Sequence, residues 1–259
     1  MRLGVSAGGS LLILASVSVL PAEQLRTVAE ELSSSTTGPL PPDYRIHEDG
    51  SVTLRLCFNW SCATQQDLTF TESDLAGVAR QMALCPGVGL HDRLQRLRIG
   101  IWQMEELAEK YQPLLANDEA VNDRDQERVG RMDCVDNSTN TTTFLHILQD
   151  LELLPGWSIA EPRVRDRFSI QVHWTAVVVD SQDPGSWSVD SWFRPNGHLP
   201  FVMPLADWVS GRIAWEAPFA GWNPFPRYSN QLCVQPVYSP PGLSHQAAKT
   251  EPPGTAVTP

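Results

Sequence analysis

Two neighbouring runs, SIQVHWTAVVVD at residues 169–180 and GSWSVDSWF at residues 185–193, decide the fold. Both are rich in β-branched and aromatic residues, which favour strands, and the Asp-Pro-Gly sequence between them is typical of a turn. We therefore predict two adjacent antiparallel strands inside a sheet. Because side chains alternate along a strand, His173 on the first strand and Asp190 on the second can lie side by side on one face.

The segment before these strands, RMDCVDNSTNTTTFLHILQDL at residues 131–151, carries apolar and small residues at helical spacing. Its Thr and Asn residues are poor helix formers, so burial against a sheet must stabilise the helix. Asp133 is placed to cap this helix, which puts Cys134 in the first turn, where the helix N-terminus favours a thiolate. Asp133 and Asp136 oppose that effect, so the thiol requires a nearby base.

His173 is the best-placed base among the six histidines of the chain. His146 lies on the same predicted helix as Cys134, about 18 Å along its axis, and cannot reach the thiol. The carboxylate of Asp190 would fix the tautomer of His173 and stabilise its charged form. We therefore expect Cys134, His173 and Asp190 to act as nucleophile, base and orienting group, with His198 as the alternative base.

The remaining sequence predicts an α+β fold in which helices pack on an antiparallel sheet. Asp49-Gly50 indicates a hairpin turn, Thr71 is a good helix N-cap, and the charged residues 117–131 are expected to form a solvated loop or a frayed helical turn. We expect strands over residues 52–58 and 67–70, and helices over residues 71–84, 91–115 and 204–211.

The ends of the chain differ in composition from its middle. Residues 1–22 have the outline of a signal peptide, and their apolar run is too short to span a bilayer. Residues 23–43 include a Ser-, Thr- and Pro-rich linker, residues 44–234 hold the domain, and the Pro-rich residues 235–259 form an expected disordered tail. We expect a secreted or periplasmic protein without a membrane span; the alternative is a cytoplasmic one.

Charge and cysteine content limit the partners and the kinds of site. The formal net charge of −11 disfavours nucleic acid, and no spacing of His, Cys and Asp indicates a metal or cofactor site. Apart from Cys134, the cysteines form an even set that gives two disulfides in an exported chain. The members of this set are Cys57, Cys62, Cys85 and Cys233, and a Cys57–Cys62 bridge is the preferred pairing.

Three short motifs resemble a known group: Cys134 in MDCVD, His173 in HWTAVV and Asp190 in WSVDSW. They resemble the transglutaminase-like branch of the papain-like cysteine peptidase superfamily, nearest to bacterial transglutaminase-like proteins, over about residues 125–210. The resemblance implies a papain-like core, with the nucleophile on a helix packed against an antiparallel sheet that supplies His and Asp. Trp174 stands where the family has a small residue after His.

The family completes its oxyanion site with a further side chain, often Trp or Gln, for which Trp102 and Gln103 are the candidates here. We expect thiol-dependent acyl chemistry on a peptide or amide substrate, by hydrolysis or by transfer, with Trp192 at the rim of the substrate cleft. The alternative is a catalytically inactive binding module of the same fold in the cell envelope. Neither function requires a cofactor.

Overall fold

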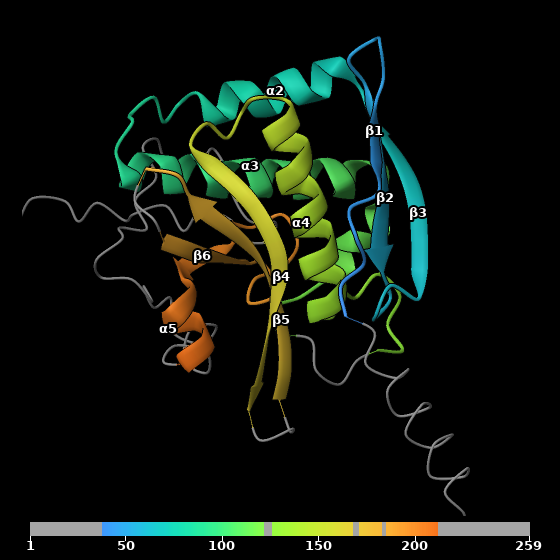
Figure 1. Ribbon diagram of the computed structural model, residues 1–259. Coiled ribbons are helices and arrows are strands. Elements are labelled where there is room, and N and C mark those ends of the chain that lie inside the picture. The colour runs from blue at the N-terminus through green and yellow to red at the C-terminus, as the bar shows by residue number, and fades with distance from the viewer. Residues whose placement is uncertain (1–37, 122–125, 168–170, 183–184, 212–259) are drawn as a thin grey trace, which may run out of the picture. The chain divides into compact units, whose positions relative to one another are not determined.

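The central element of the fold is a helix, α4 (Cys134–Asp150), which lies between two antiparallel sheets (Figure 1). The computed structural model describes residues 38–121, 126–167, 171–182 and 185–211. All of its helices and strands belong to one compact unit that begins at Pro39. α4 contacts β2 of one sheet and β4, β5 and β6 of the other.

Both sheets follow the order of their strands in the sequence. The first consists of β1 (Tyr44–Ile46), β2 (Val52–Phe58) and β3 (Thr64–Phe70). The second consists of β4 (Trp157–Arg167), β5 (Gln171–Asp180), β6 (Gly185–Asp190) and β7 (Phe201–Pro204). Every neighbouring pair is antiparallel, so short turns suffice to connect most of the strands.

Helices α2 (Glu72–Met82) and α3 (Leu90–Tyr111) pack against each other beside α4 (Figure 1). The predicted cap of α2 is confirmed, because the Thr71 hydroxyl accepts the N–H of Asp74 and the Asp74 carboxylate accepts the N–H of Thr71. α3 ends at Tyr111 rather than at residue 115, since Pro113 cannot continue the helical ladder and begins a 3₁₀ turn, Pro113–Asn117. The short helix α5 (Leu205–Ser210) follows β7.

α4 is buried along most of its length although its sequence is polar. The hydroxyls of Ser138, Thr142 and Thr143 donate to carbonyls one turn earlier in the same helix. The side chain of Asn140 pairs with β2: it accepts the N–H of Cys57 at 2.8 Å and donates to the Cys57 carbonyl at 2.7 Å. These hydrogen bonds satisfy the buried polar groups, which explains how a segment of low helix propensity forms the central helix.

Two strands and one loop differ from the sequence-based expectation. β4 was not predicted, because Pro162 and several charged residues mask its pattern; the structure places a register shift between Ala160 and Arg163 that accommodates the proline. β7 was also missed. The prediction of a solvated loop over residues 117–131 is wrong at its ends, where Asp118 and Arg131 are buried, and the Asp118 carboxylate accepts the N–H of Met132.

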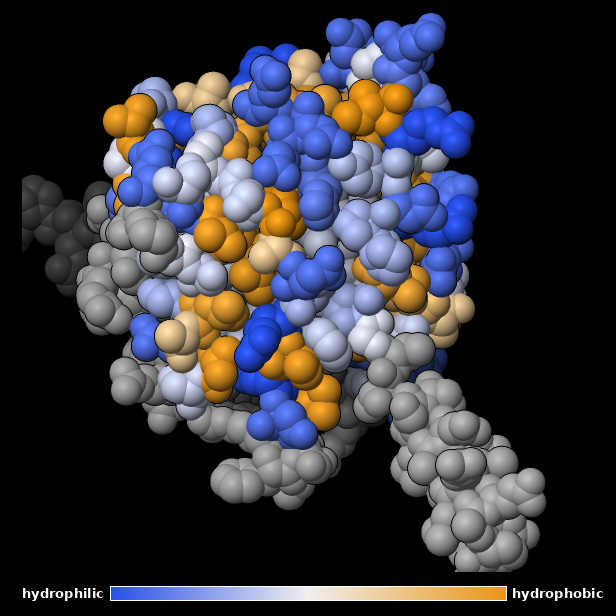
Figure 2. Space-filling view, viewed as in Figure 1, coloured by the Kyte–Doolittle hydropathy of each residue, from blue (hydrophilic) through white to orange (hydrophobic). Residues whose placement is uncertain are grey.

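The surface in view is mostly hydrophilic, with apolar residues in small separate groups (Figure 2). No helix among the described residues is long and apolar enough to cross a membrane. The expected signal peptide at 1–22, residues 23–37 of the linker, Cys233 and the tail at 235–259 lie outside the described residues.

Candidate active site

The thiol of Cys134 lies in the first turn of α4, immediately after the N-cap residue. The Asp133 carboxylate accepts the backbone N–H groups of Val135 and Asp136, and the Asp136 carboxylate accepts the N–H of Asp133. This reciprocal pair of bonds fixes where the helix begins. Cys134 is a free thiol and is partly buried.

His173 and Asp190 form a buried hydrogen-bonded pair on neighbouring strands. His173 Nε2 lies 2.8 Å from Asp190 Oδ2, and the two residues are 6% and 2% exposed. The last paired residues of β5 and β6 are Ala176 and Val189, so Asp190 follows at the end of β6 and reaches His173 diagonally. Nε2 is thus occupied by the carboxylate, and no hydrogen bond to Nδ1 is formed within the described part of the chain.

The Cys134 thiol lies against the backbone on both sides of His173. Its sulfur is 4.0 Å from the carbonyl oxygen of Val172, and it receives a hydrogen bond from the backbone N–H of Trp174. These two backbone groups point to the same edge of β5, which β6 leaves uncovered because its pairing with β5 ends at Ala176. The start of α4 therefore occupies the strand edge next to His173.

A tryptophan that the sequence did not single out completes the support of Asp190. Trp208 of α5 donates its indole N–H to Asp190 Oδ2 at 2.8 Å and is fully buried. The ring of His173 is surrounded by Trp192, Phe193 and Trp208, with centroid distances of 4.7, 5.2 and 5.6 Å. The sequence gives one general hint, which is that the indole N–H of a tryptophan needs an acceptor if the ring is buried. It does not indicate that this acceptor is Asp190.

Burial raises the pKa of the Cys134 thiol to about 12. The N–H of Trp174 acts in the opposite direction by favouring the thiolate, while the carboxylates of Asp133 and Asp190 disfavour a second negative charge nearby. The resting thiol is therefore protonated at neutral pH. Any nucleophilic chemistry at this sulfur requires transfer of its proton to a base at the moment of reaction.

The other candidates from the sequence lie in different settings. Trp192 packs on His173, and its buried indole N–H has no acceptor among the described residues. His198 is half-buried in the loop before β7, and burial together with the charge of Arg194 lowers its pKa. Trp102 and Gln103 both donate hydrogen bonds to Glu106, and the suggestion that either completes the oxyanion site stays a prediction.

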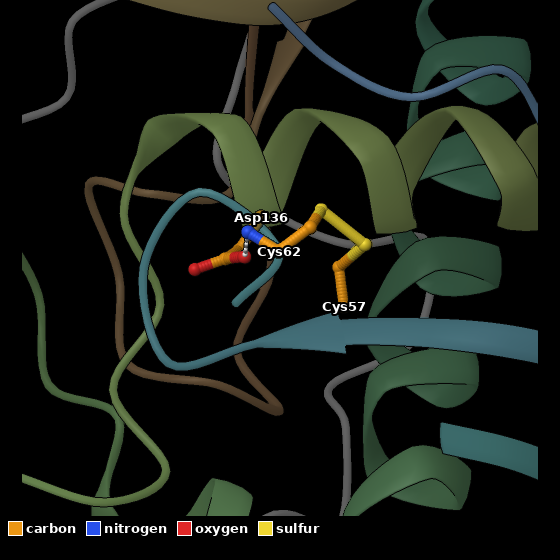
Figure 3. A group of neighbouring side chains, drawn as sticks. All are labelled: Cys57, Cys62 and Asp136. Atoms are coloured by element: carbon orange, nitrogen blue, oxygen red, sulfur yellow. Dashed lines mark hydrogen bonds between the residues drawn. A yellow bond between two sulfur atoms is a disulfide. The ribbon is translucent and has the colours of Figure 1, made fainter. Parts of the chain in front are cut away.

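Cys57 and Cys62 form a disulfide that closes a short loop after β2, the pairing preferred from the sequence (Figure 3). Their sulfurs and a carboxylate oxygen of the buried Asp136 lie within 4.8 Å of one another. This set is not a metal site in the oxidised protein, because a disulfide has no thiolate to coordinate a metal and the Asp136 oxygens accept backbone N–H groups. Cys85 is also disulfide-bonded.

An open hollow of about 420 Å³ lies between α2 and α3, lined by residues such as Asp74, Gln81 and Lys110. None of Cys134, His173 and Asp190 lines it, so it is separate from the candidate site. Comparison of the chain with protein-family models, curated proteins and solved structures found no match.

Proposed function

We propose that the protein carries out thiol-dependent acyl chemistry on a peptide or amide substrate, as a cysteine hydrolase or acyltransferase with the papain-like core of transglutaminase-like proteins. The observation that carries the proposal is the position of the Cys134 sulfur. It lies against the backbone of Val172 and Trp174, which flank His173, while Nε2 of His173 is hydrogen-bonded to Asp190. The nearness of this sulfur to the backbone beside His173 and the bond between His173 and Asp190 support the roles of nucleophile, base and orienting carboxylate.

In the proposed reaction, His173 Nδ1 accepts the proton of the Cys134 thiol as the sulfur attacks the substrate carbonyl carbon. Asp190 stabilises the imidazolium that forms. The imidazolium then gives its proton to the departing amine, which leaves a thioester on Cys134. Water or an acceptor amine, deprotonated by His173, attacks the thioester and restores the thiol.

Trp192 is the proposed substrate contact. Its ring lies on His173, and its indole N–H is buried without an acceptor among the described residues. The residue is partly exposed, and a peptide bound beside His173 would pack against the exposed part of the ring. The proposed partner is accordingly a peptide or protein rather than nucleic acid.

The competing proposal is a catalytically inactive binding module of the same fold. It is favoured by the burial that raises the pKa of Cys134 to about 12, since this keeps the thiol protonated at rest. In that case His173 and Asp190 would serve only as a buried polar pair that stabilises the sheet.

The experiment that separates the two proposals is acylation of the full chain by p-nitrophenyl acetate, with the acetylated peptide identified by mass spectrometry. An active site acetylates at Cys134, and His173→Ala slows this step by about 10²-fold or more because the general base is lost. His146→Ala is the matched control and leaves the rate unchanged, because His146 lies about 18 Å from Cys134 along the axis of α4. A binding module predicts the same slow acetylation in wild type and in His173→Ala, which would overturn the enzyme proposal.

We further propose a secreted or periplasmic location, which is supported by the disulfide between Cys57 and Cys62 and by the disulfide that includes Cys85. Such bonds persist in oxidising compartments and are rare in the cytosol. Both bonds should be present in protein isolated from the native host without reduction, as read by mass spectrometry.

A further inference from the structure

The loop closed by the Cys57–Cys62 disulfide has an unusual backbone. Four consecutive residues, Asn59, Trp60, Ser61 and Cys62, have φ angles of 64°, 64°, 52° and 56°. None of them is glycine, and the left-handed region is disfavoured for residues that carry a Cβ atom. A run of four such residues persists only where surrounding bonds enforce it.

The loop over residues 57–62 is hydrogen-bonded to the first turn of α4. The N–H of Cys62 donates to Asp136 at 2.6 Å, and the hydroxyl of Ser61 donates to Asp133 at 3.0 Å. The same two carboxylates cap the helix, and Cys134 lies between them in the sequence. Figure 3 shows the disulfide and the hydrogen bond between Cys62 and Asp136 beside the helix.

We propose that the Cys57–Cys62 disulfide is a redox-sensitive latch that holds the first turn of α4, and with it the Cys134 thiol, in its observed position. With the crosslink intact, Cys62 presents its N–H to Asp136. Once the crosslink is broken, the left-handed residues relax toward ordinary backbone conformations and withdraw the donors from both capping carboxylates. The first turn of the helix then frays and exposes Cys134.

The chemistry that opens the latch is thiol–disulfide exchange with a dithiol. A thiolate of the dithiol attacks the sulfur of Cys62, which is 8% exposed, whereas Cys57 is 1% exposed. The second thiol of the reagent then displaces the mixed disulfide. Two electrons and two protons pass to the protein, which ends with two thiols, and the reagent ends as a cyclic disulfide.

The remainder of α4 stays in place when the latch opens, because Asn140 holds the backbone of Cys57 independently of the disulfide. The effect is therefore confined to the start of the helix. This inference concerns the conformation around Cys134 and does not depend on the proposed acyl chemistry.

The test is hydrogen–deuterium exchange and iodoacetamide labelling of the full chain, comparing wild type with the variant Cys57→Ser/Cys62→Ser. We expect the amides of Val135 and Asp136 to exchange on the order of tenfold faster in the variant, and Cys134 to be alkylated faster by a similar factor. Exchange at residues 144–148 should not change. Cys85→Ser, which removes the other disulfide, is the control and should leave the first turn as in wild type.

Wild type reduced with dithiothreitol provides the same comparison without mutation, in case the double variant does not fold. Mass spectrometry of the alkylated peptides identifies which sulfurs have been released. Unchanged exchange at the first turn after the Cys57–Cys62 bond is broken would overturn the proposal. So would an equal increase along the whole of α4, because this would show general loosening rather than a local latch.

Discussion

Replacing Asn140 by Ala removes the two hydrogen bonds that fasten the buried face of α4 to β2. The N–H and the carbonyl of Cys57 lose their partners in a place where Cys57 is 1% exposed. Each buried backbone group left without a hydrogen-bond partner costs about 1–3 kcal/mol, so the free energy of unfolding should fall by about 4 kcal/mol for the two together. This is a large share of the total stability of a domain, which is about 5–15 kcal/mol.

The measurement is urea unfolding of the full chain, followed by fluorescence of the buried tryptophans. Thr142→Val is the matched control, because the Thr142 hydroxyl donates only to the Ser138 carbonyl of its own helix, and this carbonyl keeps its helical partner. We expect the control to lose no more than about 1 kcal/mol. If Asn140→Ala unfolds within about 1 kcal/mol of Thr142→Val, the view that Asn140 anchors the polar helix is refuted.

Two further predictions concern pH. Since burial raises the pKa of Cys134 to about 12, its alkylation by iodoacetamide should accelerate about tenfold per pH unit from about pH 7 to 10, and a plateau in this range would contradict the raised pKa. Burial also raises the pKa of Asp136 and of Glu105 to about 8, whereas the unfolded chain releases these protons near pH 4, at about the ordinary carboxyl values. The folded state thus binds more protons between these values, so the free energy of unfolding should fall as pH rises from about 5 to 8. Asp136→Asn/Glu105→Gln should flatten this slope in urea unfolding, and a slope equal to that of wild type would show that other groups cause it.

Local signals in the sequence were sufficient to predict the helix and the two strands that carry the candidate site. The cap at Asp133, the β-rich run around His173 and the turn before β6 each follow from the intrinsic preferences of neighbouring residues. Alternation along the strands then placed His173 and Asp190 on one face, and the structure joins them by a hydrogen bond. The α+β class followed from the same patterns, although Pro162 concealed β4.

The sequence could not place groups whose partners are distant along the chain. Trp208 reaches Asp190 only because α5 folds back over the sheet, and Asn140 binds Cys57 across a separation of 83 residues. The pKa values of Cys134 and Asp136 are set by burial, which is a property of the packed molecule and not of the neighbouring residues.

The sequence by itself determined the α+β class, the order of the elements other than β4 and β7, the capped start of α4 and the residues proposed as nucleophile, base and orienting carboxylate. Only the tertiary structure decided that the Cys134 sulfur lies at the uncovered edge of β5, between the backbone groups of Val172 and Trp174. It also decided that a left-handed disulfide loop holds the helix start from the other side. The physical reason is that short-range preferences fix local conformation, whereas burial and long-range hydrogen bonds arise only when the packed elements meet.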